Sequence, residues 1–262
     1  MMRVLKKEIM ESEEEAFAYD LVVNKYVDIV NAGFAETVIN LSPSHGSFLE
    51  IGTGSGRDAI LIAKNTYNIG ITALDLSDAM LKLAIQNARR ERVDNKINFI
   101  KGDAKSLPFD DGAFDAVFCH NMLHHLPQPE KMLSEIKRVV KSDGAIIIRD
   151  LIRYSKILNA ACVNILGINY NKTMREEYRK SILASYSKQE WLELKDKMNL
   201  FDLRFTKQFM THVSIERVSA RRRTDYIKVA SPFYKRLAAS FYISRPKNIK
   251  VPKKEASDGK IY

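Results

Sequence analysis

The stretch Leu49-Glu50-Ile51-Gly52-Thr53-Gly54-Ser55-Gly56 decides the fold, because it places three glycines on alternate positions after an apolar run. The apolar residues that lead into Glu50 predict a buried strand, and residues 57–64 predict a helix. Glycine permits the sharp turn between them and lets a ligand approach the backbone where a Cβ would clash. The segment therefore predicts a binding turn between a strand and a helix of an α/β protein.

Two aspartates follow at intervals of one strand. Asp75 ends the apolar segment 69–75, and Asp103 follows the segment 97–101. A carboxylate at the end of a second strand can accept hydrogen bonds from both hydroxyls of a ribose. The alternatives are structural: the glycines can serve tight packing, and each aspartate can cap a turn or a helix, Asp75 near Ser77.

The glycine spacing distinguishes between cofactors. A dinucleotide-binding turn has the pattern G-x-G-x-x-G and holds a pyrophosphate at the helix N-terminus. Here the pattern is G-x-G-x-G with an acid, Glu50, beside it. An acid repels a pyrophosphate but suits a ligand that carries an ammonium and a sulfonium.

The pattern E-x-G-x-G-x-G at 50–56 resembles the first motif of the class I S-adenosylmethionine-dependent methyltransferases. Further segments are similar, in the same order, to the branch that includes the ubiquinone and menaquinone C-methylases, the methyltransferase type 11 domain. They are Gly102-Asp103-Ala104, Leu107-Pro108-Phe109, Phe114-Asp115-Ala116-Val117, Leu123-His124-His125-Leu126, and the helix and turn from Leu133 to Gly144. The resemblance covers about residues 47–150.

The resemblance implies S-adenosylmethionine as cofactor and S-adenosylhomocysteine as product. In the family pattern Asp75 holds the ribose, and Asp103 receives the adenine amino group while Ala104 contributes its backbone. The residues expected at the cofactor are Tyr19, Glu50, Gly52, Thr53, Gly54, Ser55, Gly56, Asp75, Leu76, Met80, Gly102, Asp103, Ala104, His120 and Asn121. Tyr19 is expected to close over the cofactor, but it can equally be an aromatic residue of an amphipathic helix packed on the core.

Alternating predicted strands and helices organise the chain. Strands at about 47–51, 70–75, 97–101, 114–119 and 144–150 alternate with helices, which demands a parallel sheet with right-handed crossovers. Two more strands, at about 201–207 and 211–217, complete the expected seven-stranded, mostly parallel, Rossmann-like sheet, with helices on both faces and an antiparallel edge pair. We expect an N-terminal helical cap at 1–46, a methyltransferase domain at 47–220 with a helical insertion at about 151–185, and a basic extension at 221–262.

The acceptor is expected beyond the carboxyl ends of the strands, under the N-terminal helices and the insertion. His124, His125 and His212 are candidate catalytic residues, and a base is needed only if the acceptor loses a proton of high pKa. The pair His124-His125 can equally fix the loop after the fourth strand by hydrogen bonds. His212 is expected on an edge strand near the cap.

Two further features of the insertion bear on the acceptor. Arg153, just after the fifth strand, suits either an anionic acceptor or a surface ion pair. The apolar residues between 157 and 168 favour a small, partly hydrophobic acceptor, although core packing explains them equally well.

The composition is that of one globular enzyme domain with additions, at 262 residues and 45% hydrophobic. Cys119 and Cys162 form no disulfide framework and no metal-ligand spacing, so we expect a cytoplasmic protein without a metal. No stretch approaches about 20 apolar residues, the length that spans a bilayer, and the N-terminal residues lack the apolar core of a signal peptide.

The formal net charge of +10 is concentrated near the C-terminus, because residues 1–216 hold 29 basic and 29 acidic residues. Residues 231–242 have the N-cap, proline and apolar spacing of an amphipathic helix. Such a helix can pack on the domain, contact a second copy in a homodimer or lie on a membrane surface. Basic and aromatic residues can also hold RNA, although Cys119-His120-Asn121-Met122 differs from the Asn/Asp-Pro-Pro-aromatic motif of many base amino-methylating enzymes.

These observations together predict an S-adenosylmethionine-dependent methyltransferase that acts on a small molecule. The alternatives are an RNA or protein methyltransferase whose basic extension binds the acceptor, and a protein that binds S-adenosylmethionine without catalysis.

Overall fold

The computed structural model describes residues 3–5, 12–14, 16–17, 20, 28–168, 170–208 and 211–230. Tyr19 and the predicted helix at 231–242 lie outside these residues, so the predictions made for them stay predictions.

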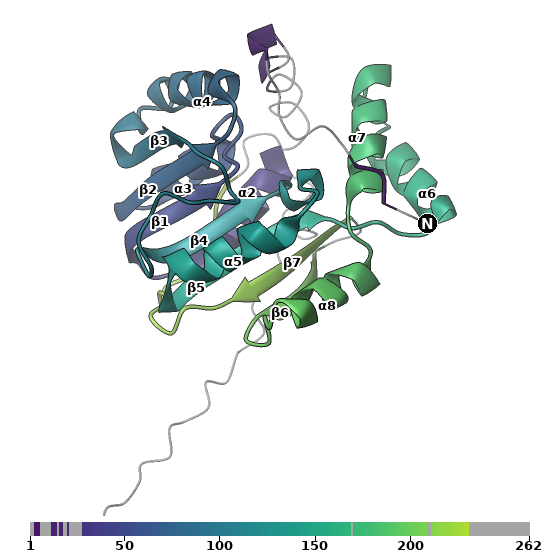
Figure 1. The fold of residues 1–262 in the computed structure, drawn as a ribbon. Helices are drawn as coiled ribbons and strands as arrows, with labels where there is room; N and C mark the ends of the chain where they lie inside the picture. Colours follow the sequence, from purple (N-terminus) through teal and green to yellow (C-terminus); the bar gives the residue numbers. More distant parts are fainter. Residues whose placement is uncertain are drawn as a thin grey trace, which may run out of the picture.

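The fold is built on a seven-stranded sheet with the strand order β3-β2-β1-β4-β5-β7-β6. Neighbouring strands from β3 to β5 pair in parallel, and β7 pairs antiparallel with both β5 and β6, as Figure 1 shows. The predicted seven-stranded, mostly parallel sheet is confirmed. The strands are β1 (His45–Ile51), β2 (Asn68–Asp75), β3 (Ile97–Lys101), β4 (Phe114–His120), β5 (Val140–Leu151), β6 (Arg204–Gln208) and β7 (His212–Arg217).

Two details of the sheet differ from the sequence-based expectations. β5 begins at Val140, where helix α5 ends, and not after a turn at Gly144. Val140 pairs with Phe114, and the register shifts before Ala116 pairs with Ala145, so an irregularity absorbs the residues between. His212 lies on β7, which is second from the edge, because β6 forms the edge itself.

Helices cover both faces of the sheet. One face is packed against α2 (Asp28–Leu41), α3 (Arg57–Asn65) and α4 (Asp78–Arg90), and the other against α5 (Pro129–Val139) and α8 (Lys188–Lys197). Successive residues of the central strands alternate between these two cores: Phe118 joins the first, whereas Val117 and Cys119 join the second. Burial on both faces is typical of a parallel sheet between two helical layers.

The predicted insertion forms two helices, α6 (Lys156–Leu166) and α7 (Lys172–Ala184), which lie side by side at one end of the sheet in Figure 1. The apolar run of α6 is only partly used for packing. Cys162 and Val163 are buried, whereas Ile157, Leu158 and Ile165 are 54% to 82% exposed. Core packing therefore explains only part of this run.

The helix ends follow the predicted local signals. Ser77 accepts a hydrogen bond from the backbone N–H of Met80 at the start of α4. Ser187 and Glu190 form a capping box at the start of α8, in which each side chain accepts from the other residue's backbone N–H. These caps satisfy donors that a helix leaves unpaired in its first turn.

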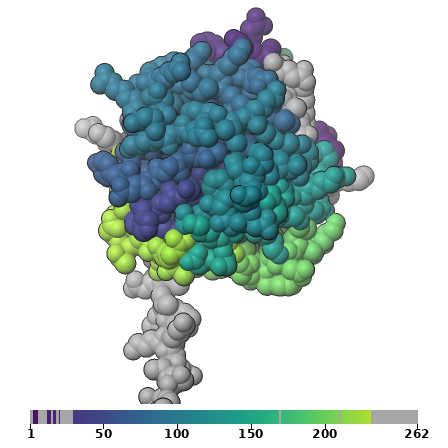
Figure 2. Space-filling view, turned by 60° about the vertical axis from the view of Figure 1, so that its left-hand side comes forward, coloured from purple at the N-terminus to yellow at the C-terminus, as the bar shows by residue number. Residues whose placement is uncertain are grey.

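The beginning of the basic extension packs against α2. Asn40 exchanges hydrogen bonds with the backbone of Ile227, and Glu36 accepts bonds from the Tyr226 hydroxyl and the Val229 N–H. In Figure 2 the yellow end of the described chain lies against the purple-blue segment around the start of β1. The described residues from 221 to 230 are therefore part of the packed domain. In the part of the chain that is described, no helix has the length and apolar character to cross a membrane.

Candidate cofactor and acceptor site

The glycine turn after β1 has the shape of a ligand cradle. Gly52, Gly54 and Gly56 have φ angles of 74°, 53° and 81°, which L residues with a side chain rarely adopt. A Cβ on Gly52 would lie 2.6 Å from Met122 Cγ, and one on Gly56 would lie 3.0 Å from Ala84 Cβ, but one on Gly54 would meet nothing within 4 Å. Gly52 and Gly56 thus serve packing, whereas Gly54 faces open space.

Asp75 fixes this cradle from the end of β2. Its carboxylate accepts hydrogen bonds from the Gly54 N–H at 2.7 Å and the Ser77 N–H at 2.9 Å. Burial raises the pKa of Asp75, while these backbone N–H groups act to lower it. Each carboxylate oxygen has a further lone pair, so the same group can brace the turn and still accept a ligand hydroxyl.

Glu50 lies beneath the turn, 2% exposed, and accepts a hydrogen bond from the Thr53 hydroxyl. Burial raises the pKa of Glu50 well above its usual value, and the neighbouring charge of Asp58 adds to the rise. Thr53 and Ser55 are also buried, so their side chains support the turn from within. The electrostatic effect of a cation held above this turn would favour the ionised form of Glu50.

Three residues that the sequence analysis did not single out tie the N-terminal segment to this turn. Asp20 forms a bidentate ion pair with Arg57, the first residue of α3, at 2.8 Å. Asn87 of α4 donates to the Ser55 carbonyl at 3.0 Å. Asp20 directly follows Tyr19 in the sequence, and no local pattern marks it, because its partner is 37 residues away.

The predicted adenine-side residues follow β3. The Gly102 N–H donates to the Asp75 carbonyl at 3.0 Å, and Ala104 is buried. Asp103 accepts from the Lys105 N–H at 2.8 Å, which is the turn-capping contact offered as its alternative role, and its side chain is 40% exposed. Met80 is buried at the start of α4, beside Ala16. These residues lie at the carboxyl ends of the strands, as the glycine turn does, next to Asp75.

The loop after β4 carries two histidines, and each is held by a carboxylate. His120 Nδ1 lies 2.8 Å from Asp58 Oδ2, and His124 Nδ1 lies 2.6 Å from Asp150 Oδ1. Both histidine side chains are almost fully buried. The carboxylate contact favours the proton on Nδ1, so each Nε2 presents a lone pair. Neither Nε2 has a hydrogen-bond partner.

Asp150 also fixes the backbone of this loop, because it accepts from the His124 N–H at 2.9 Å. Burial by itself would raise the pKa of Asp150, but its charge and hydrogen-bond contacts with His124 lower the pKa below the usual value. His124 thus fixes the loop after β4 through its hydrogen bonds with Asp150, which is the structural role given above as the alternative to catalysis. Asn121 turns the chain at φ 52° and leaves its buried Oδ1 unpartnered.

The other predicted acceptor residues are placed differently. His125 packs against His124, with 4.2 Å between ring centroids. His212 is buried at the start of β7, and its ring lies 6.1 Å from that of His120. Arg153 is not on the surface: it is buried and forms an ion pair with Glu190 at 2.6 Å. Its charge serves the junction between β5 and α8.

Arg3 closes the same side of the site and was missed by the sequence analysis. Its guanidinium donates to the carbonyls of His124 and Leu126, both at 2.8 Å, and stacks over the Tyr186 ring. This residue therefore joins the loop after β4 to the chain that follows α7. A single arginine near a chain end gives no sequence signal for such a role.

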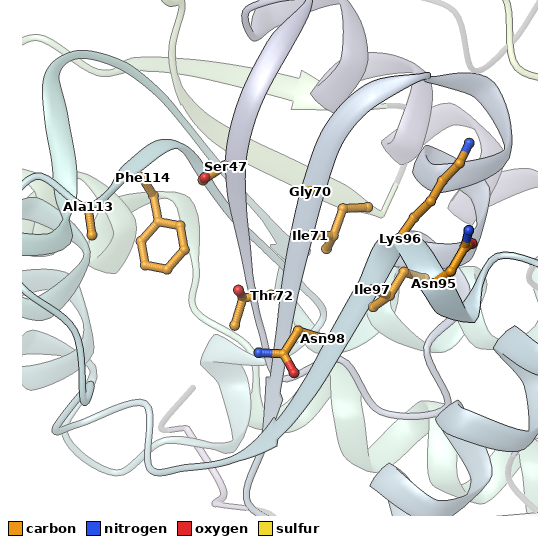
Figure 3. A pocket seen from close by; sticks show the side chains of 10 residues that line it. All are labelled: Ser47, Gly70, Ile71, Thr72, Asn95, Lys96, Ile97, Asn98, Ala113 and Phe114. Carbon is orange, nitrogen blue, oxygen red and sulfur yellow. The ribbon is translucent and has the colours of Figure 1, made fainter.

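Figure 3 shows a pocket of about 400 Å³ whose lining includes Ser47, Gly70, Thr72, Asn98 and Phe114. These residues lie on β1 to β4, most of them near the amino ends of the strands, whereas the glycine turn lies at the carboxyl ends. In α/β sheets ligands bind beyond the carboxyl ends of the strands, so this pocket is not the candidate site. Among the described residues, no group of three or more His, Cys, Asp or Glu side chains could hold a metal ion.

The comparisons with known proteins agree with this geometry. Residues 49–148 match the model of the methyltransferase domain family. Ajmaline N-methyltransferase of Rauvolfia serpentina is 33% identical over 44% of this chain and 39% of its own length. Demethylmenaquinone methyltransferase of Clavibacter sepedonicus is 29% identical over 55% of this chain and 60% of its own length.

A similar fold occurs in a solved structure from Methanococcus maripaludis, a candidate S-adenosyl-L-methionine-dependent methyltransferase. It has a TM-score of 0.64 and 21% identity, and the match covers 86% of this chain and all of the other. The chain spans about 39% to 60% of the length of the two curated relatives it matches. The match to the domain model, the order of the motifs and the geometry of the glycine turn support one conclusion: residues 49–148 form a methyltransferase domain of the class I S-adenosylmethionine-dependent type.

Proposed function

We propose that this protein transfers the methyl group of S-adenosylmethionine to a small-molecule acceptor bound beyond the carboxyl ends of β4, β5 and β7. The observation that carries the proposal is the open backbone at Gly54, braced by the Asp75 carboxylate within a methyltransferase domain. The two curated relatives act, by their names, on ajmaline and on demethylmenaquinone. Both are small molecules, which supports an acceptor of this kind.

The cofactor would lie along the strand ends from β3 to β4. Asp75 would accept the ribose hydroxyls, and Asp103 with the backbone of Ala104 would contact the adenine. The amino acid part would rest on Gly54 and above Glu50, where its ammonium group would favour the ionised form of the buried carboxyl. Tyr19, beside the anchored Asp20, would close over it.

Bound S-adenosylmethionine would supply an electrophilic methyl group: the acceptor's electron pair would form the new bond to the methyl carbon, and the sulfur would keep the S–C electron pair. The protein's part is to align the acceptor with that bond and to exclude water. Helix α7 contacts the turn at His124, so the insertion covers the site. His124, oriented by Asp150, is the candidate base where the acceptor loses a proton.

The nucleic-acid alternative finds little support in the described part of the basic extension. Arg221 binds Asp115 and Asp143 at 2.8 Å and 2.6 Å, and Arg223 binds Asp225 at 2.9 Å. These guanidinium groups are engaged within the fold, whereas a phosphate-binding surface needs free cations. The roles proposed for 231–242, in a homodimer or at a membrane surface, concern residues outside the described part.

Calorimetric titration with S-adenosylmethionine and S-adenosylhomocysteine, with NAD as control, tests the proposal. Saturable binding of the first two alone is expected. Release of S-adenosylhomocysteine in the presence of small amines, phenols and quinols then separates a catalyst from a protein that only binds the cofactor. Binding of NAD alone, or of none of the three by folded protein, would contradict the proposed site.

A further inference from the structure

Two buried histidines from different strands lie close together on one face of the sheet. His120 ends β4 and His212 begins β7, with β5 between them, and their ring centroids are 6.1 Å apart. Neither Nε2 has a hydrogen-bond partner. A buried polar atom without a partner costs about 1–3 kcal/mol, so two of them close together call for an explanation.

The position of His120 is fixed from two sides. Its ring stacks on Phe34 of α2, with 4.3 Å between centroids, and its Nδ1 contacts Asp58 Oδ2 at 2.8 Å. This carboxylate contact favours a proton on Nδ1. Its Nε2 is a hydrogen-bond acceptor with nothing to accept.

His212 is held in the neutral form. Burial, with smaller contributions from the neighbouring His120 and Arg149, lowers the pKa of His212 to about 3. Its Nδ1 contacts the Thr211 hydroxyl at 3.0 Å. The imidazole is thus uncharged at physiological pH and can share a hydrogen bond with a neutral group.

The neighbouring cation, Arg149, is held by groups other than the two histidines. Arg149 donates to the Ser214 and Thr37 hydroxyls, both at 2.9 Å, and its guanidinium lies over Phe34. The fixed positive charge of Arg149 acts on His212, so it disfavours an ammonium group there and favours a neutral donor.

We propose that His120 and His212 form a subsite that binds a neutral hydroxyl or amine group of the acceptor, with His120 Nε2 accepting its hydrogen. The ring centroids are 6.1 Å apart, and each ring has a buried Nε2 without a partner, so one polar group between them could satisfy both. The subsite lies toward β5 and β7, away from the ribose and adenine positions at β2 and β3. It therefore belongs to the acceptor and not to the cofactor. This inference rests on the proposed function.

The test is NMR of protein labelled with ¹⁵N at its histidines, of which the chain has five. The sample is first titrated with S-adenosylhomocysteine, and failure of that titration would contradict the proposed function itself. Phenol is then compared with anisole, which has the same ring and oxygen but no hydrogen to donate. Phenol is expected to shift the His120 Nε2 resonance, and anisole is not. His45, exposed at the start of β1, serves as the internal control.

Asp58→Asn provides the matched variant. Without the carboxylate, the His120 ring is no longer held with its proton on Nδ1, as in histidine dyads generally. The variant is expected to bind S-adenosylhomocysteine and to lose the response to phenol. The subsite would be refuted by an Nε2 that carries the proton in the unmodified protein, by equal shifts with phenol and anisole, or by no shift with either. A water that phenol does not displace would give this last result.

Discussion

Replacing Gly54 by alanine separates the cost to the fold from the cost to binding. Gly54 has φ 53°, and a Cβ there would meet nothing within 4 Å. The fold therefore bears only the left-handed backbone strain, about 1–2 kcal/mol. Gly112 is a matched control: its φ is 64° and its surroundings are equally open. It precedes β4, at the amino ends of the strands and away from the glycine turn.

The two variants should differ in binding alone. Both should lose about 1–2 kcal/mol in the free energy of unfolding, measured by chemical denaturation. If the cofactor packs against the backbone at Gly54, the added methyl group crowds that contact and costs about 1–3 kcal/mol of binding free energy. S-adenosylhomocysteine binding then weakens about 5- to 150-fold. Gly112→Ala should bind as the unmodified protein does. Unchanged affinity in Gly54→Ala, or an equal loss in both variants, would refute the assignment of the open turn to the cofactor.

Three further predictions follow from named contacts. Asp75→Ala removes the ribose acceptor and the brace of Gly54, so S-adenosylhomocysteine affinity in calorimetry should fall at least about tenfold, each charge-assisted bond being worth roughly 1.5–3 kcal/mol. Burial opposes ionisation of Asp115, but hydrogen bonds from Lys141, the Ser47 N–H and Arg221 lower its pKa to about 2. Asp115→Asn should therefore lose up to about 2 kcal/mol of unfolding free energy above pH 4, and the difference should fade as the pH drops toward 2; a difference independent of pH would argue against this linkage. A protein that ends at residue 218 should have a lower melting temperature than one that ends at 230, because the contacts of Tyr226 and Val229 with α2 are removed.

Local sequence signals predicted most of the elements, for reasons that the structure makes plain. Ser77 and the capping box at Ser187 depend on contacts three residues apart, so the sequence contains both partners. The glycine turn was equally readable, because only glycine adopts these φ angles without strain. The predicted start of β5 was wrong because its first residues pair with Phe114 across an irregularity, and pairing between strands leaves no local pattern.

The roles of the charged residues were harder to predict from the sequence. Arg153 and Arg3 look alike in sequence, but one is paired with Glu190 and the other holds the carbonyls after His124. Asp58 shows no motif, yet it contacts His120 and raises the pKa of Glu50. Such partners are tens of residues apart, and only the folding of the sheet brings them together.

The sequence by itself determined the class of fold, the type of cofactor and the position of its turn, because strand burial, glycine conformation and helix caps are local properties. The tertiary structure alone decided which histidines are held by carboxylates, which ring nitrogens are left without partners, and where the basic extension packs. These depend on strand order: β4, β5 and β7 are neighbours in the sheet although β7 begins 92 residues after β4 ends, at His212 and His120 respectively. Hydrogen bonding and burial act over a few ångströms, so the surroundings of His120 and His212 follow from that adjacency and not from any motif.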